Sequence, residues 1–275
     1  MLELPEARCI SQQLNQAVQG KKITEIIAAQ SPHKFAWFAG DPKDYPGKLL
    51  NKTFGPAENI GGMVQIKVDD MLLVFMEGVR LRFCRPDETR PKKHQLLLGF
   101  EDDTYLYGSI QMYGGLCCFK PGDFKKDYYQ AAISKPSPFT GDFNAVYFES
   151  LITARDVQKT SVKAFLATEQ RIPGLGNGIL QDILFNAKIH PRKKTSSLTA
   201  DQINNLFRSI KDTINEMADK NGRDTEKDIF GNPGKYTTKC SKNTVGKPCS
   251  ECGSEILKAN YMGGSVYFCK DCQVI

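Results

Sequence analysis

The first apolar pattern in the chain has the spacing of a helix. The apolar residues that recur at steps of three and four are Ala7, Ile10, Leu14 and Val18. This spacing places them on one helix face, and Gly20 is a suitable stop just beyond the helix end. We expect this helix to hold the first residues of the chain rigidly against the domain behind it.

From about residue 20 to residue 130 the pattern changes to that of β-strands. Two apolar runs, 63–68 and 71–76, flank a polar Asp-Asp pair, and this arrangement predicts a hairpin. Residues 94–100 and 104–110 flank an acidic turn and predict a second hairpin. Because no helical pattern interrupts these hairpins, they favour an antiparallel sandwich.

Beyond a stretch containing proline, glycine and serine, Ser134 to Gly141, the period becomes helical. Thr199 and Gln202 form a capping box, and the apolar residues after them line one helix face as far as residue 217. We expect Gly222 to end this helix and the polar stretch after it to be a mobile loop. The predicted domains are residues 1–133, 142–238 and 239–275.

Composition and charge narrow the class of protein. The chain has 275 residues, with 37 basic and 31 acidic side chains and a formal charge of +6. This balance suits a nucleic-acid partner, although many unrelated enzymes are equally basic. No run approaches the roughly 18 apolar residues of a membrane span, and Glu3 and Glu6 stand where a signal peptide is basic. We therefore expect a cytoplasmic protein without a membrane partner.

Four of the nine cysteines form two C-x2-C pairs; they are Cys249, Cys252, Cys269 and Cys272. Two such pairs place four thiolates around one tetrahedral zinc ion, with sulfur about 2.3 Å from the metal. Because four cysteines complete the coordination, the predicted cofactor is one structural Zn(II) per chain. A redox pair is the alternative, but two pairs that bracket a short hairpin argue against it. The odd total of cysteines suits a reducing compartment.

Two other segments carry candidate chemistry. The chain opens M-L-E-L-P-E, with carboxyl groups at Glu3 and Glu6, and residues 172–177 read I-P-G-L-G-N before a predicted helix. Gly174 and Gly176 allow a tight turn there, and amides at a helix N-terminus bind phosphate. Alone, such a turn is more often a simple helix cap.

In order and spacing, the opening hexapeptide, the G-L-G-N turn and the cysteine pairs resemble the landmarks of the Fpg/Nei family of DNA repair glycosylases. The resemblance spans the chain and implies an α+β fold. Its parts are an N-terminal antiparallel β-sandwich with an N-terminal helix, a helix–two-turn–helix domain and a zinc-finger β-hairpin. It also implies base excision repair, in which the enzyme flips a damaged base from the duplex and cleaves its glycosidic bond. In the family an N-terminal proline amine forms a Schiff base, and elimination then nicks the strand.

The resemblance assigns roles to residues of this chain. Glu3 and Glu6 would handle protons, and Asn177, together with Gly176, would bind the phosphate beside the lesion. Lys188 is a candidate contact to the DNA backbone, with a solvated surface as the alternative. His190, from the end of the same signature, is expected to be a packed histidine.

The family's nucleophile position holds Leu2 instead of proline. Removal of an initiator methionine requires a small second residue, so we expect Met1 to remain. Retention moves the amine by up to about 3.8 Å, which is large for a catalytic group. If Met1 is removed, Leu2 offers a primary amine that is able to form a Schiff base.

Other family positions also differ. The catalytic lysine falls on Gly62 and the phosphate-binding arginine of the zinc finger on Gly264; each lost phosphate contact flattens the log–log salt dependence of binding by about 0.9. The segment that supplies wedge residues keeps only its aromatic, as Tyr113, with Gln111 as a second DNA-binding candidate. The wedge methionine falls at Glu77, one residue after a methionine.

These departures leave three functional hypotheses. The first is a DNA N-glycosylase whose AP-lyase activity is weak or lost, with Glu3 or Glu6 activating water or protonating the sugar. The second is a non-catalytic protein that binds damaged DNA or abasic sites, and the third is an adaptor that binds protein through the zinc hairpin. For the first two the expected partner is damaged duplex DNA, with single-stranded DNA left open, and the chain is expected to be a monomer.

Overall fold

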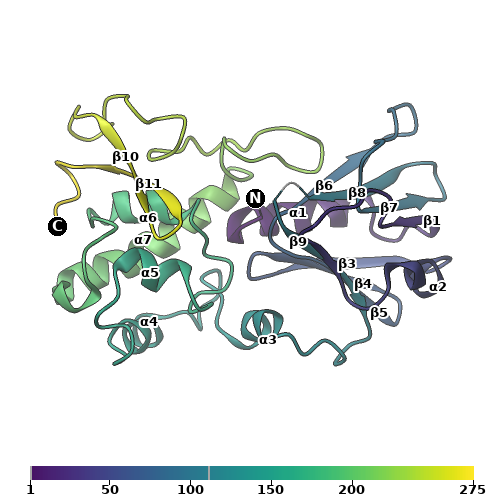
Figure 1. Cartoon of the computed structure of the whole chain (residues 1–275), viewed down its shortest axis with the longest axis horizontal. Helices are drawn as coiled ribbons and strands as arrows, with labels where there is room; N and C mark the ends of the chain where they lie inside the picture. The colour runs from purple at the N-terminus through teal and green to yellow at the C-terminus, as the bar shows by residue number, and fades with distance from the viewer. Residues whose placement is uncertain (1, 111) are drawn as a thin grey trace.

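The computed structural model describes residues 2–110 and 112–275, which form two lobes (Figure 1). The predicted N-terminal helix is present as α1 (Leu4–Ala17), with Pro5 in its first turn and Glu6 beside it. Proline is tolerated there because the first helical amides have no partner within the helix. Gly20 follows with a φ of +87°, a conformation that glycine adopts without strain.

The N-terminal lobe contains two β-sheets. The four-stranded sheet has the order β1 (Ile23–Ala28), β7 (Leu96–Phe100), β8 (Tyr105–Ile110) and β6 (Val79–Cys84). The five-stranded sheet has the order β2 (Ala36–Phe38), β9 (Gly114–Phe119), β5 (Met71–Phe75), β4 (Met63–Val68) and β3 (Phe54–Ile60). One apolar core joins residues of both sheets and the buried face of α1. Both predicted hairpins, β4–β5 and β7–β8, are confirmed. The short helix α2 (Tyr45–Leu49) lies beside β1.

The sandwich has one exception to its antiparallel pairing. Strand β2 runs parallel to β9, with Ala36 opposite Gly114 and Phe38 opposite Leu116. No apolar alternation in the sequence indicated this strand, because it is only three residues long. The pairing brings the segment before β2 to the end of β9 that faces the other lobe.

The C-terminal lobe is helical and carries the cysteine hairpin at its top (Figure 1). Its helices are α4 (Ala145–Ile152), α5 (Val162–Ala167), α6 (Leu180–Asn186) and α7 (Ala200–Asp219). The preceding helix, α3 (Asp127–Ser134), packs through Tyr129 against the five-stranded sheet of the N-terminal lobe. The capping box of α7 is confirmed, with Thr199 and Gln202 bonded reciprocally. The hairpin consists of β10 (Ile256–Tyr261) and β11 (Gly264–Cys269). Among the described residues, none of the helices combines the length and apolar character needed to cross a membrane.

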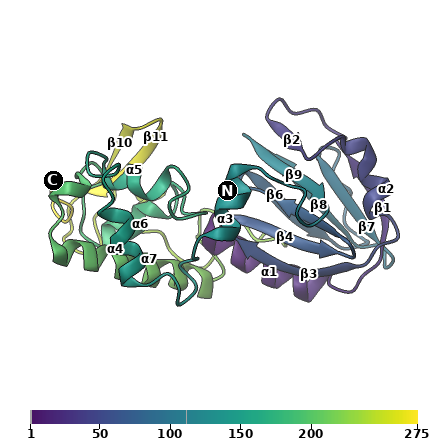
Figure 2. The same cartoon turned by 90° about the horizontal axis from the view of Figure 1, so that it is seen from below.

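The first residues of the chain join the two lobes. Leu2 is buried in the core of the N-terminal lobe, whereas Leu4 is buried in the core of the C-terminal lobe. The amide of Leu4 also donates to the carbonyl of Gly174, at 2.9 Å. Figure 2 shows α1 starting at this junction and running along the five-stranded sheet.

The prediction of a mobile loop after Gly222 is wrong for its middle part. Ile229 is fully buried in the core of the N-terminal lobe, and its carbonyl accepts from the amide of Phe83 at 2.8 Å. The carbonyl of Asp228 accepts from Arg82 at 2.6 Å. This segment therefore crosses from the helical lobe and packs against the sandwich, above α1 in Figure 1.

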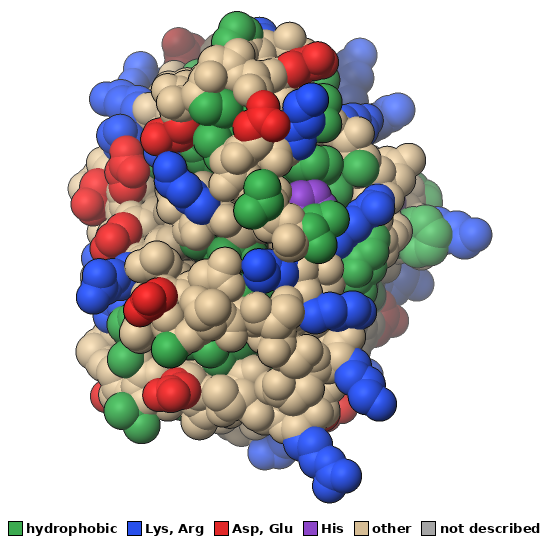
Figure 3. Space-filling view, turned by 90° about the vertical axis from the view of Figure 1, so that its left-hand side faces the viewer, with side chains coloured by type: hydrophobic (Ala, Val, Ile, Leu, Met, Phe, Trp, Pro, Cys, Tyr) green, Lys and Arg blue, Asp and Glu red, His purple; other side chains and the backbone are tan. Residues whose placement is uncertain are grey.

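Charge is unevenly spread over the outer end of the C-terminal lobe. In Figure 3 most acidic side chains lie on the left half of this face, and lysines and arginines dominate its right-hand edge. Basic side chains thus gather along one edge of this face. Such an edge favours contact with a polyanion.

Candidate active site and nucleic-acid interface

Two carboxyl groups from the start of α1 meet one arginine from the far end of the sequence. Glu6 accepts from the Arg223 guanidinium at two points, Nε at 2.8 Å and Nη2 at 2.9 Å. Arg223 Nη1 lies 3.4 Å from a carboxylate oxygen of Glu3. Because Glu3 is the N-cap and Glu6 lies in the first turn, both side chains reach the same side of the helix start.

Glu3 is also held by the helical lobe. Its two carboxylate oxygens accept from the amides of Gly178, at 2.9 Å, and Ile179, at 2.8 Å. A Cβ on Gly176 would lie 2.6 Å from Glu3 Oε1. The glycine is therefore required for the carboxylate to approach the turn before α6.

This contact changes the interpretation of the G-L-G-N turn. Helix α6 begins at Leu180 rather than near Asn177, and the amides of Gly178 and Ile179 bind Glu3, so they are not open to a phosphate. Asn177 itself is exposed, and its side chain donates to the carbonyl of Ser265 at 3.0 Å. Asn177 thus lies at the contact between the turn and the cysteine hairpin.

The three charged groups of this cluster are deeply buried. Glu3, Glu6 and Arg223 are exposed by 4%, 5% and 2%. Burial raises the pKa of Glu3, while the Arg223 charge and the two amides oppose that shift. Glu3 and Glu6 raise the pKa of Arg223 against the effect of its burial, so the guanidinium stays charged. Two carboxyl groups and one permanent cation are therefore fixed together away from water.

Leu2 does not present a reactive group on an open surface. Its side chain is 3% exposed and belongs to the core of the N-terminal lobe. It lines a cavity of about 240 Å³ next to Glu6, with Arg80, Arg82 and Lys227 among the other lining residues. Met1, the other candidate for the reactive amine, lies outside the described residues.

A third carboxyl group, that of Glu77, lies beside Gly62, the position to which the family resemblance assigns a lysine. A Cβ on Gly62 would lie 2.9 Å from Glu77 Oε1 and 3.1 Å from the Cα of Gly174. Burial raises the pKa of Glu77 to about 7, and the charge of Glu3 adds to the increase. No local pattern in the sequence indicated the environment of Glu77, because its neighbours Gly62 and Gly174 come from the two lobes.

The candidate DNA contacts on the sandwich lie beside this acid. Tyr113 is 44% exposed, and the charges of Glu77 and Glu3 contribute to the raised pKa of its hydroxyl. Gln111 lies outside the described residues. Met76 is only 2% exposed and contacts Cys117 with its sulfur at 3.9 Å, so it is not available as a wedge.

Lys163 was missed by sequence reasoning. A Cβ on Gly264 would lie 3.6 Å from Lys163 Nζ and 3.7 Å from the side chain of Asn177. The lysine donates to the carbonyl of Tyr261, and burial lowers its pKa. An ammonium group therefore lies beside Gly264, the position to which the family resemblance assigns a phosphate-binding arginine.

Lys188 and His190, the other two residues singled out in the sequence, have different surroundings. Lys188 is exposed and lines a cavity with Asp212 and Glu216, after the C-terminal end of α6 and away from the amides that hold Glu3. His190 is packed, as predicted: it is 6% exposed, and its ring meets that of Phe268 edge-on at 4.6 Å.

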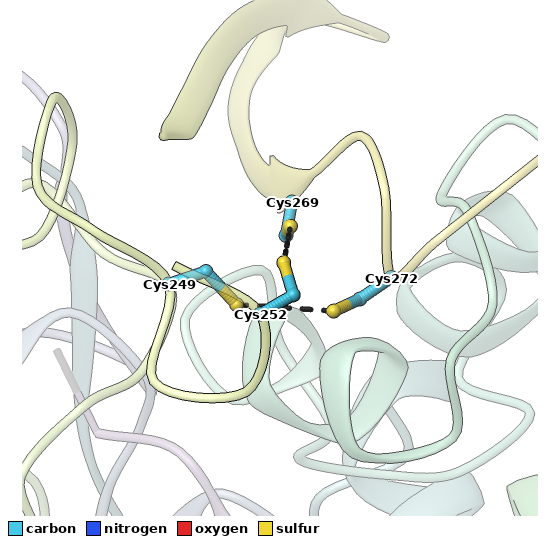
Figure 4. Close-up of side chains that lie close together, drawn as sticks. All are labelled: Cys249, Cys252, Cys269 and Cys272. Atoms are coloured by element: carbon cyan, nitrogen blue, oxygen red, sulfur yellow. Dashed lines mark hydrogen bonds between the residues drawn. The ribbon is translucent and has the colours of Figure 1, made fainter. Parts of the chain in front are cut away.

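The four cysteines of the C-terminal hairpin converge (Figure 4). Their sulfur atoms all lie within 4.8 Å of one another. The Cys249–Cys272 and Cys252–Cys269 sulfur pairs are 3.8 and 3.5 Å apart. A tetrahedron with metal–sulfur distances of about 2.3 Å has edges of about 3.8 Å, so the cluster has the size of a four-thiolate metal site.

Comparison with known proteins agrees with this arrangement. Residues 135–227 match the family model of the formamidopyrimidine-DNA glycosylase H2TH domain. A formamidopyrimidine-DNA glycosylase of Lactobacillus gasseri is 28% identical over 287 residues, covering 100% of this chain and 99% of that protein. One of Cytobacillus firmus is 27% identical over 284 residues, with full coverage of both chains.

Solved structures give the same result. The Lactococcus lactis Fpg in complex with DNA containing an abasic site superposes with a TM-score of 0.84 at 24% identity, covering 99% of this chain and 100% of that one. The same enzyme with a THF-DNA and an inhibitor gives 0.84 at 25% identity, with the same coverage. The chain is therefore similar to Fpg-type DNA glycosylases along its whole length, and residues 135–227 match their H2TH domain. The α+β architecture inferred from the sequence is confirmed.

Leu2, Gly62 and Arg223 all lie at the junction of the two lobes, around Glu3 and Glu6. Gly264 lies elsewhere, at the cysteine hairpin beside Lys163 and Asn177. Among the described residues, the departures noted in the sequence therefore fall at two places, the junction and the hairpin.

Proposed function

We propose that this chain is a DNA glycosylase that removes damaged bases by hydrolysis and whose strand-nicking activity is weak or absent. One observation carries the proposal: the two carboxyl groups that open the Fpg/Nei chain are held rigidly at the junction of the lobes. Relatives of this chain are named formamidopyrimidine-DNA glycosylases, and its structural neighbours were solved with lesion or abasic-site DNA.

The reaction breaks the bond between the sugar C1′ and the base nitrogen, and the bonding electrons leave with the base. A water oxygen forms the new bond to C1′, its proton passes to a carboxylate, and the departing base takes up a proton. The sugar becomes positively charged in the transition state. Carboxyl oxygens of Glu3 and Glu6 stabilise that cation without reorganisation, because hydrogen bonds and ion pairs to Arg223 and to the amides of Gly178 and Ile179 already hold them in place.

Glu77 is the group best matched to proton transfer near neutral pH. A catalytic acid or base works best when its pKa lies near the working pH, and burial brings the pKa of Glu77 to about 7. Its position beside Gly62 faces the same junction as Glu3. We assign it to the protonation of the departing base.

This chain lacks the two groups that the family pattern provides for strand nicking, the N-terminal proline and the lysine. Schiff-base chemistry needs a free amine at the sugar, and the proline that supplies it in the family pattern is replaced by Leu2, behind an initiator methionine that we expect to remain. Gly62 supplies no lysine in its place. The cysteine cluster holds, in this proposal, one structural Zn(II), because four thiolates leave no coordination position for a substrate.

The test measures base release and covalent trapping separately. Duplexes with oxidised, alkylated and deaminated bases are incubated with the protein, and released bases are counted before and after alkali. We expect base release with strand breaks only after alkali, and we expect Glu3→Gln and Glu6→Gln to lower it at least a hundredfold. Glu149→Gln, on the exposed surface of α4, is the matched control.

Borohydride trapping on abasic-site DNA, with intact-mass spectrometry of the N-terminus, completes the test. A covalent adduct at residue 1 or 2 would refute the loss of nicking activity. Binding without base release on every duplex would refute the enzyme and support a non-catalytic lesion binder.

A further inference from the structure

A group of exposed apolar side chains lies beside the candidate active site, on the edge of the five-stranded sheet. Phe35, Trp37, Met112 and Tyr113 are exposed by 56%, 39%, 65% and 44%. They come from two segments that the parallel pairing of β2 with β9 brings together, since the carbonyl of Phe35 accepts from the amide of Gly114 at 3.1 Å. Large side chains of this kind are seldom left together in water without a binding role.

The indole of Trp37 packs on the sheet over Gly115, which has no side chain. A Cβ on Gly115 would lie 2.8 Å from the Cζ2 atom of Trp37 and 2.9 Å from the sulfur of Met76. The indole therefore lies over a position that has no side chain, with one part packed and the rest open. A ring held in this way loses little conformational freedom when a ligand stacks on it.

A cavity of about 820 Å³ continues from Trp37 and is strongly basic. Four lysines line it against a single acid, Asp123; they are Lys48, Lys120, Lys125 and Lys126. Phe119 and Phe124 line it too and stack on each other with their ring centroids 4.5 Å apart. Flat apolar rings and clustered cations thus share one concave surface.

We propose that this surface, from Tyr113 across Trp37 to Lys126, binds a single-stranded segment of the DNA that the junction of the lobes holds. Bases stack on aromatic side chains regardless of sequence, and a groove with lysines follows the phosphates. A duplex would keep its bases stacked on one another and leave the indole unused. The surface is continuous with Tyr113 at the candidate active site, so a strand leaving that site reaches it directly. This inference rests on the proposed function, in that DNA is the ligand.

Trp37 is the only tryptophan of the chain, so its fluorescence reports this surface alone. The probes are an oligo-dT strand, a blunt duplex, and the same duplex with a single-stranded dT extension. We expect oligo-dT and the extended duplex to quench the fluorescence, and the extension to tighten binding about tenfold over the blunt duplex. Trp37→Phe removes the signal and, measured by anisotropy, keeps most of the gain because it keeps a ring.

Charge reversal tests the lysines. Lys125→Glu with Lys126→Glu is expected to abolish the gain from the extension and leave binding of the blunt duplex unchanged. The matched control is Lys92→Glu with Lys93→Glu, an exposed pair of adjacent lysines in the same lobe that does not line the cavity. We expect the control to keep the tenfold gain.

The outcomes separate this inference from the proposed function. Equal binding of blunt and extended duplexes, with no quenching, overturns the inference even where base release is active. Quenching by an acidic peptide but not by oligo-dT also overturns it and indicates a protein partner. Quenching and a tenfold gain in a protein that releases no base support the inference while refuting the glycosylase.

Discussion

Replacement of Glu77 by glutamine tests whether the acid at the lobe junction is placed as described. The substitution keeps the shape of the side chain and removes its titration. In the folded protein burial raises the pKa of Glu77 from its usual value near 4.5 to about 7. At about 1.4 kcal/mol for each pH unit, this difference corresponds to about 3 kcal/mol.

The direction of the pH dependence of the free energy of unfolding follows from which state, folded or unfolded, binds the proton of Glu77 more tightly. Below pH 4.5 the acid is protonated in both folded and unfolded chains, so it adds no pH dependence. As the pH rises from 4.5 to 7, the unfolded chain loses its proton first, and the free energy of unfolding falls. Above about pH 7 the full penalty of about 3 kcal/mol remains.

Glu77→Gln is therefore expected to gain stability relative to the parent protein as the pH rises through this range. Urea unfolding at closely spaced pH values between 4 and 8.5 measures the difference. Glu149→Gln controls for the removal of a surface charge. A difference between Glu77→Gln and the parent that stays constant across the range would refute the buried environment assigned to this acid. In the activity assay, loss of a titration near pH 7 in Glu77→Gln would mark it as the proton donor.

Three further predictions concern the junction and the cysteine cluster. Arg223→Ala leaves two buried carboxyl groups unpaired and is expected to lower the free energy of unfolding by about 3–5 kcal/mol in urea titrations, whereas Arg208→Ala on exposed α7 should change it by less than about 0.5 kcal/mol. Gly62→Lys places its Cβ 2.9 Å from Glu77 Oε1 and 3.1 Å from Gly174 Cα. We expect it to lower the free energy of unfolding by about 1–3 kcal/mol in the same urea titrations. Adding Glu77→Ala should restore only part of that stability, because the contact with Gly174 remains. Elemental analysis should find one zinc per chain, and Cys252→Ser should lose it and melt earlier; unchanged zinc content would refute the four-thiolate site.

Sequence patterns predicted the parts of this fold whose information is local. The capping box of Thr199 and Gln202 and the two long hairpins depend on residues close together in the chain, and all were found. The pairing of Arg223 with Glu6 spans 217 residues, so no spacing in the sequence indicated it. The loop that carries Arg223 looked mobile because it is polar, yet buried Ile229 and the hydrogen bond from Arg82 to Asp228 hold it against the N-terminal lobe.

Side chains of this chain occupy the described positions at which it departs from the Fpg/Nei pattern. Here Leu2 fills the core beside Glu6, the Glu77 carboxyl stands in the space above Gly62, and Lys163 lies beside Gly264. Arg223 meets both glutamates and leaves neither buried carboxyl without a cation. Because the described part of the junction is packed and Glu3 and Glu6 keep a cation beside them, we expect the site to keep a reaction.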